Sequence, residues 1–195
     1  MIDEGSTPAT LNGNNADPAS YTSITIRPGQ QGVVVRGNPG IGFGVVQFFG
    51  SDNIIINGDH AASPGINRDL TFENYSTATA QNTSCIRIAV NGTNANSANN
   101  ISILNCEFIG NVRAGNNNLI TGTGLAANLS YGIFVGGGVN GIQNVDPVPS
   151  LTNLPGALDS VAPSGAQIQN MYIAQNGFIS MGRAIVFNGG ATSVG

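Results

Sequence analysis

The chain has 195 residues, of which 41% are hydrophobic and only 8% are charged, with a formal net charge of -4 at pH 7. This length is sufficient for one domain with a buried core. The six basic residues are isolated arginines, which excludes the dense positive charge that nucleic acid requires. No run of about 18 apolar residues occurs, so we expect no membrane span.

Short apolar runs recur along the whole chain. Each is rich in β-branched or aromatic residues and is bounded by Gly, Asn, Asp or Pro, which is typical of strands. No window has apolar residues at helical spacing over three turns. We therefore predict an all-β chain with almost no helix. The predicted strands are residues 24–26, 33–35, 45–49, 54–56, 70–72, 86–90, 101–104, 132–135, 171–174 and 184–187.

The turn signals favour corners over hairpins. Asn-Gly begins at residues 12, 57, 91, 140, 176 and 188. Asn-Gly is the strongest short hairpin signal, but a hairpin needs a second strand directly after it. After Asn57-Gly58 the sequence instead runs DHAASPGINRD before the next strand begins. These pairs therefore predict corners that lead into loops.

Internal repetition predicts how the strands are arranged. Similar units begin near residues 45, 86, 132 and 184, with loops of different length between them. This pattern predicts a right-handed parallel β-helix, a solenoid with long loops and two or three short strands in each coil. In ISILNCEFI the alternation slips at Leu104-Asn105, which predicts a corner there. We expect Asn side chains at such corners to bond to Asn side chains in the coil above.

The segment 140–165 has no period and contains four prolines. We expect it to form a long loop or small lobe that projects from the single domain 1–195. Long loops on a rigid scaffold often carry binding sites.

Two stretches resemble a known repeat: VVQFFGSDNIIINGD, and then RDLTFENYSTATAQNTSCIRIAVNGTNANSANNISILNCEFIG. They are similar to the pectin-lyase-like β-helix repeats in large secreted surface proteins of polysaccharide-degrading bacteria, which are exported by the type IX secretion system. The resemblance implies an adhesin-like protein that is extracellular or on the cell surface. The acidic N-terminus MIDEGSTPAT is unlike a signal peptide, and no C-terminal sorting domain follows ATSVG, so we expect part of a longer chain.

The densest group of titratable residues comprises Asp59, His60, Asp69 and Glu73. One interpretation is a carbohydrate or metal site in the loop after the strand 54–56. The alternative is a solvated corner in which Asp59 caps the turn backbone. Adjacent Asp and His side chains in a strand point to opposite faces, which favours the alternative.

Enzymes with this fold use calcium-binding carboxylates with a basic residue, or paired carboxylates. The chain has no lysine, and arginine is a poor base. Asp52, Asp59 and Asp69 are the candidate calcium ligands, although lone carboxylates at corners are more often turn residues. We therefore assign no catalytic residue, no metal site and no cofactor. Cys85 and Cys106 lie in apolar runs, where buried free thiols are favoured and a disulfide stays open.

We therefore predict a non-catalytic structural or adhesive segment that assembles end to end into an oligomer or filament. The alternative is a domain that binds or cleaves polysaccharides. That alternative needs exposed aromatic side chains, and a groove lined by Tyr131, Phe134 and Tyr172 would support it. Only 6% of the residues are aromatic, and tryptophan is absent. A segment of a phage or virus fibre shares the fold and stays open.

Overall fold

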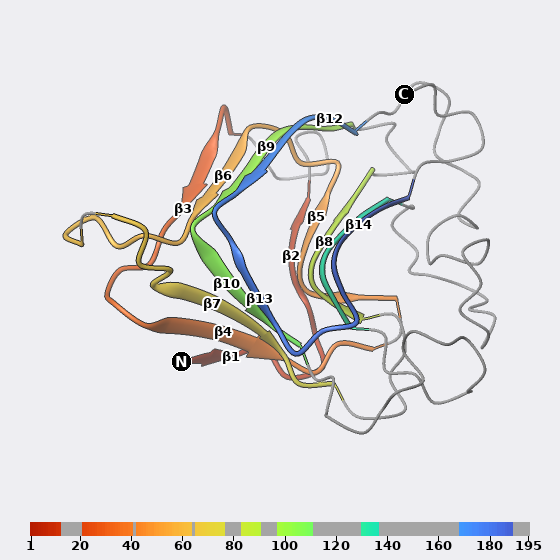
Figure 1. The fold of residues 1–195 in the computed structure, drawn as a ribbon. Coiled ribbons are helices and arrows are strands. Elements are labelled where there is room, and N and C mark those ends of the chain that lie inside the picture. The colour runs from red at the N-terminus through yellow and green to blue at the C-terminus, as the bar shows by residue number, and fades with distance from the viewer. Residues whose placement is uncertain are drawn as a thin grey trace.

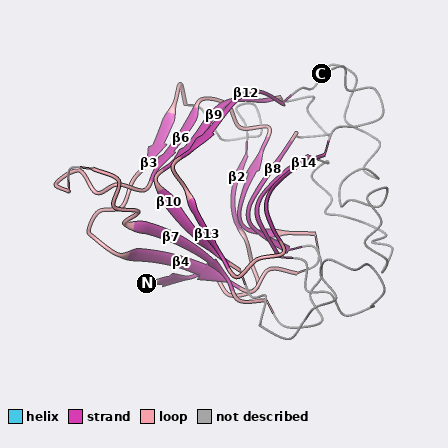
Figure 2. Ribbon diagram, in the orientation of Figure 1, coloured by secondary structure: helices cyan, strands magenta, loops and turns pink. Residues whose placement is uncertain are grey.

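The computed structural model describes residues 1–12, 21–40, 42–63, 65–76, 83–90, 97–110, 130–136 and 168–188. These residues form fourteen strands and no helix (Figure 2), so the all-β prediction is confirmed for the described part of the chain. Each of the ten predicted apolar runs coincides with a strand. The predicted loop at 140–165 lies outside the described residues.

The strands belong to three parallel sheets. Sheet A contains, in spatial order, β1 (Ile2–Asp3), β4 (Val33–Gly37), β7 (Leu70–Asn74), β10 (Cys106–Ile109) and β13 (Gly177–Ile179). Sheet B contains β2 (Ala9–Asn12), β5 (Gly44–Phe49), β8 (Thr83–Ala89), β11 (Ser130–Gly136) and β14 (Arg183–Asn188). Sheet C contains β3 (Ile24–Ile26), β6 (Ile54–Asn57), β9 (Ala98–Leu104) and β12 (Ile168–Ala174).

Successive strands along the chain belong to sheets A, B and C in turn, and three such successive strands are called a circuit below. Each strand pairs in parallel with the third strand after it. The three sheets surround a common interior (Figure 1), and the main apolar core draws residues from all of them. The run pattern does not predict β1, β2, β10 and β13, because these strands have only single apolar residues or pairs. The alternation after the corner at Leu104-Asn105 is the signal for β10.

Alternate residues face the interior along the regular part of a strand, as β6 shows. In β6, Ile54 and Ile56 are 0% exposed, whereas Ile55 is 41% exposed. Pairing in register stacks like on like, so that Ile54 pairs with Ile101 and Ile56 with Ile103. Complete burial of such a side chain stabilises the fold by roughly 1.5–3 kcal/mol.

Aromatic rings form a corresponding column in sheet A. The ring centroids of Phe72 and Phe108 lie 5.5 Å apart, and those of Phe108 and Phe178 lie 5.1 Å apart. Both pairs are stacked nearly in parallel. The column follows directly from the register, which pairs Phe72 with Phe108 and Phe108 with Phe178.

The predicted corner at Leu104-Asn105 is confirmed. Strand β9 ends at Leu104, β10 begins at Cys106, and Asn105 between them has a φ of 54°. Asparagine is one of the few residues other than glycine that adopt this left-handed conformation at low cost. The inward positions resume at Cys106 and Phe108, which are both 0% exposed.

The predicted amide ladders are also present. Asn100 Nδ2 donates to Asn53 Oδ1 at 2.9 Å, and Asn170 Nδ2 donates to Asn100 Oδ1 at 2.9 Å. All three residues have a φ between 54° and 57°. At the next corner, Asn105 Nδ2 donates to Asn57 Oδ1 at 3.1 Å. The ladder of Asn53, Asn100 and Asn170 therefore bends successive circuits at the same place, and both ladders link successive circuits.

Gly58 lies where two circuits make close contact. A Cβ atom at this position would overlap the carbonyl oxygen of Asn105 and would lie 2.9 Å from Cys106 Cα. These neighbours are backbone atoms of a corner and cannot rotate away. We expect Gly58→Ala to lower the free energy of unfolding by about 1–3 kcal/mol, measured by urea denaturation. Gly29→Ala is the control, because nothing lies within 4 Å of its Cβ position. Equal effects of the two variants would contradict the close packing of circuits.

Two contributions of Asn100 to stability can be measured separately: its tolerance of the left-handed backbone and its amide hydrogen bonds. Asn100→Gly keeps the left-handed backbone and removes both amide bonds, and should cost about 1 kcal/mol. Asn100→Ala also forces a Cβ into this backbone conformation, and should cost about 1–2 kcal/mol more. At Ser102, in an ordinary part of the same strand, the order should reverse, with glycine costing more than alanine. Urea denaturation of the four variants measures both orders. If Asn100→Ala proved the milder change at Asn100, the left-handed corner would be refuted.

Candidate functional site

The loop 58–69 between β6 and β7 holds three of the four predicted site residues, and it projects from the sheets (Figure 1). Asp59 Oδ1 accepts backbone N–H bonds from Asn67 at 2.8 Å and from Arg68 at 3.4 Å. Asp69 Oδ2 accepts the backbone N–H of His60 at 3.1 Å. The structure therefore brings Asp59, His60 and Asp69 together, and it uses both carboxylates to hold the loop backbone.

The imidazole of His60 also contacts its own loop. Its Nδ1 accepts the backbone N–H of Ala62 in a long bond of 3.4 Å. The side chain is half-buried. A histidine in this position orders the turn, and whether the loop also binds a ligand stays a prediction.

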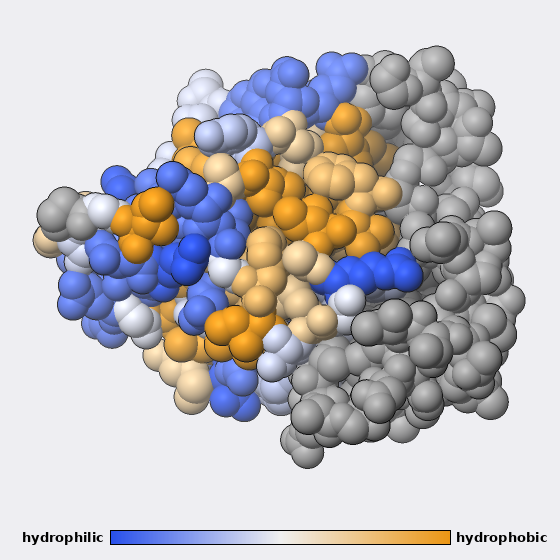
Figure 3. Space-filling view, viewed as in Figure 1, coloured by the Kyte–Doolittle hydropathy of each residue, from blue (hydrophilic) through white to orange (hydrophobic). Residues whose placement is uncertain are grey.

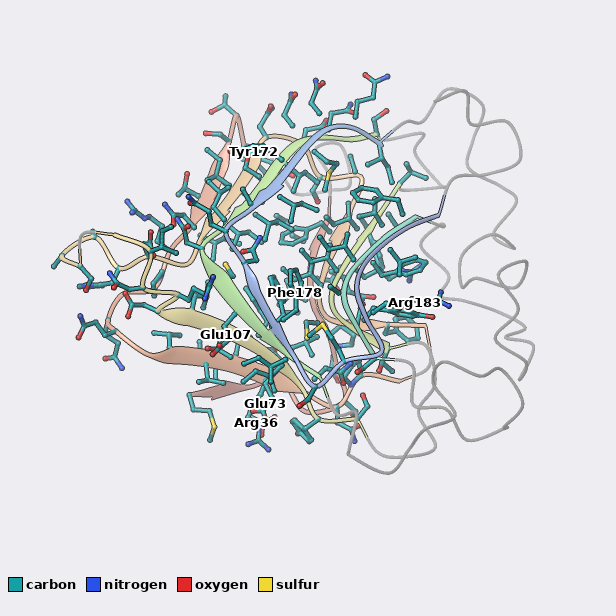
Figure 4. The ribbon with its side chains drawn as sticks, viewed as in Figure 1. Arg36, Glu73, Glu107, Tyr172, Phe178 and Arg183 are labelled. Atoms are coloured by element: carbon teal, nitrogen blue, oxygen red, sulfur yellow. The ribbon has the colours of Figure 1, made fainter. Side chains whose placement is uncertain are left out.

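The fourth predicted residue, Glu73, is separated from the other three. It lies in β7 on the outer side of sheet A, where its Oε2 is 3.9 Å from Arg36 Nη1 (Figure 4). Arg36 Nε also lies 3.3 Å from Asp3 Oδ2. The sequence places Glu73 four residues from Asp69, but the register of sheet A places it beside Arg36.

Sequence reasoning did not predict this cluster on sheet A. Its members are Asp3, Arg36, Glu73 and Tyr75, and they come from three successive circuits. The Tyr75 hydroxyl donates to Asp3 Oδ1 at 3.0 Å, and the guanidinium of Arg36 lies 4.3 Å from the Tyr75 ring centroid. The backbone N–H of Gly5, the Tyr75 hydroxyl and the Arg36 charge together lower the pKa of Asp3.

Glu107 is a second outward carboxylate that sequence reasoning did not single out. It lies in β10 and pairs with Thr71, so that Glu73 and Glu107 are diagonal neighbours on adjacent strands. The alternation of ILNCEFI, with Cys106 and Phe108 inward, was the available signal. A glycoside hydrolase uses two carboxyl groups that flank the bond it cleaves. Glu73 and Glu107 supply two such groups on one face, but Glu73 is already paired with Arg36.

The three aromatic residues proposed for a sugar-binding groove do not share a surface. Tyr131 and Phe134 are each 1% exposed and pack together with Val186, with ring centroids 5.6 Å apart. Burial raises the pKa of Tyr131 to about 12. Tyr172 is 61% exposed and lies on sheet C. These residues therefore form no common stacking platform.

The outward residues of β5, β8 and β11 are buried. Arg87 is 1% exposed, and its guanidinium carbon lies 5.3 Å from the Phe49 ring centroid. Its register partners, Gln47 and Phe134, are 3% and 1% exposed. The outer side of sheet B is consequently not an open binding face, and the sequence signal for this was an arginine inside the apolar run CIRIAV.

The carboxylates considered for calcium are bonded to backbone N–H groups. Besides Asp59 and Asp69, Asp52 Oδ1 accepts the N–H of Asn99 at 2.6 Å. Within the described ranges, no group of three or more His, Cys, Asp or Glu side chains is arranged to hold a metal ion. The same part of the chain contains no helix with the length and apolar character needed to span a bilayer.

Comparison with models of protein families, with curated proteins and with solved structures finds no match to this chain. The function must therefore be inferred from the residues and their geometry alone.

The lowered pKa of Asp3 predicts a pH dependence of stability. A carboxyl group with a depressed folded-state pKa stabilises the fold in full above its ordinary value of 3.8, and this contribution disappears as the pH falls through the lowered value. Asp3→Asn should therefore reduce the urea midpoint at about pH 6, and this effect should shrink as the pH falls below 3.8. The control, Glu4→Gln, removes the neighbouring carboxylate and leaves the cluster intact. A constant difference between wild type and Asp3→Asn across this range would contradict the assignment.

Cys85 and Cys106 are free, buried thiols. Burial raises the pKa of each to about 12, so that both stay protonated near neutral pH. We expect iodoacetamide to modify neither in the native protein and both in urea without reductant, as measured by mass spectrometry. Fast modification of the native chain would show that its core opens at that cysteine.

Proposed function

We propose that the chain is a right-handed parallel β-helix of the pectin-lyase-like kind, and that it is a non-catalytic structural or adhesive segment of an extracellular or cell-surface protein. The pairing of every strand with the third strand after it supports this architecture. The right hand follows from the strong preference of parallel crossover connections, about 98% of which are right-handed.

The functional part of the proposal rests on what the polar side chains bind. In the loop 58–69 the carboxylates bind backbone, on sheet A the carboxylates of Asp3 and Glu73 are paired with Arg36, and on sheet C the amides bind the next circuit. In an enzyme, some of these polar side chains would lack a partner within the fold so that they can bind substrate, and this lowers the stability of the fold. A scaffold needs only regular stacking. Location at the cell surface rests on the resemblance of residues 45–108 to secreted surface repeats.

The alternative is a domain that binds or cleaves polysaccharides. The observation in its favour is the diagonal pair Glu73 and Glu107 on the outer side of sheet A. If the domain cleaves polysaccharides, its substrates would be polyuronates or neutral glycans, and cleavage would use paired carboxylates or a base assisted by calcium.

A glycan assay separates the two functions. The wild type, Glu107→Gln and Glu73→Gln would be incubated with a panel of neutral and acidic polysaccharides, with and without calcium, and new chain ends would be measured. We expect no cleavage by any of the three proteins. Cleavage by the wild type that Glu107→Gln abolishes, and that the control Glu4→Gln retains, would replace the structural proposal with an enzymatic one.

A further inference from the structure

Among the described residues, those of the last circuit leave apolar side chains of the core columns partly exposed. In sheet B, Ile133 and Val135 are 0% and 3% exposed, whereas their register partners in β14, Ile185 and Phe187, are 37% and 59% exposed. In sheet A, Phe108 is 0% exposed and its partner Phe178 is only partly buried. Apolar side chains gather in the middle of this end of the molecule (Figure 3), and Phe178 points into the interior (Figure 4).

The first circuit presents the other end of the same columns. Ile2, the register partner of Val35, is 51% exposed. Leu11, the partner of Phe48, is only partly buried. Strands β1 and β2 are the edges of sheets A and B, so within the described residues no further strand pairs with their outer backbone groups. Such edges are templates for pairing with another chain.

We propose that the β13–β14 edge of one molecule binds the β1–β2 edge of a second copy, so that the chain assembles head to tail. This inference rests on the proposed β-helix. Continued register would place Phe178 beneath Ile2 of the second copy, and Phe187 beneath its Leu11. Each contact covers an apolar side chain that one molecule leaves exposed, and the new strand pairs satisfy backbone groups on both edges.

The two ends differ in charge in a way that favours this orientation. The first circuit carries the carboxylates of Asp3 and Glu4. The described part of the last circuit, residues 168–188, carries Arg183 and no carboxylate. Head-to-tail contact brings Arg183 of one copy to the end of the second copy that carries these carboxylates. A contact between different surfaces of identical molecules continues into a filament unless the rotation closes a ring.

The joint is assigned to sheets A and B because of the order of the strands. The last strand, β14, belongs to sheet B, and the first strand, β1, belongs to sheet A. When β1 follows β13 and β2 follows β14, one strand position stays open in sheet C between β12 and β3 of the second copy.

The outer side of sheet A is the suitable place for a test, because Ile179 is 45% exposed there.

Disulfide trapping tests this register. Asp3, Arg36, Glu73, Ile109 and Ile179 occupy one outward column of sheet A. Adjacent strands lie about 4.8 Å apart, a spacing at which cysteines can bond, whereas two steps exceed that reach. A mixture of Asp3→Cys and Ile179→Cys proteins should therefore give covalent dimers under mild oxidation. The double variant should give a ladder of oligomers on a non-reducing gel.

Controls within one molecule distinguish the two proposals. Glu73→Cys with Ile109→Cys should cross-link internally, and Arg36→Cys with Ile109→Cys should not. If the first internal pair fails, the stacked β-helix itself is wrong. If it forms and the pair between molecules does not, the β-helix stands and the head-to-tail joint is overturned. The latter result is also expected if another segment of the same chain covers the last circuit.

Sedimentation tests the contribution of the apolar end. Phe187→Asp places a charge in the proposed joint, and Ile66→Asp places one on the loop 58–69, at a side chain that is 52% exposed. We expect the wild type and Ile66→Asp to form oligomers whose size grows with protein concentration, and Phe187→Asp to stay monomeric with an unchanged circular dichroism spectrum. A wild type that is monomeric at all concentrations, or a Phe187→Asp variant that assembles normally, would overturn the joint.

Discussion

Parallel backbone pairing between each strand and the third strand after it is the constraint on which the rest of this structure depends. It repeats the same column positions every circuit, so that isoleucine stacks on isoleucine in sheet C and phenylalanine on phenylalanine in sheet A. The core is therefore a set of columns that a further circuit can always extend. At the ends of the described stack, Phe187 on one side and Ile2 on the other are 59% and 51% exposed.

The polar residues serve the same stacking. Asparagine is suited to the corners for two reasons: it tolerates a positive φ, and its amide both donates to one neighbour and accepts from another. Asn100 does both, since it donates to Asn53 and accepts from Asn170. Amides achieve this without charge, which explains how a chain with so few ionised side chains can hold its circuits in register.

Function is constrained by the surfaces that the stack leaves open. The outer side of sheet B is buried, the aromatic residues are divided between sheets, and the carboxylates of the loop 58–69 are bonded to backbone. The outer sides of sheets A and C and the two ends of the columns remain available. The ends offer apolar area and unpaired strand edges, which suit a protein partner of the same architecture better than a soluble sugar.

Local sequence patterns were enough to predict the strands, the corner at Leu104-Asn105 and the stacking of asparagine side chains, because these depend on local alternation and on residues that accept a left-handed backbone. They also placed Asp59, His60 and Asp69 in one loop, since these residues are close in the chain. The pairing of Glu73 with Arg36, the contacts of Asp3 and Tyr75 in the same cluster, and the position of Glu107 beside Glu73 became visible only in the folded chain. Those contacts depend on which residues share a column across circuits. That register is set by the lengths of the intervening loops and by packing in the interior, and no local pattern encodes it.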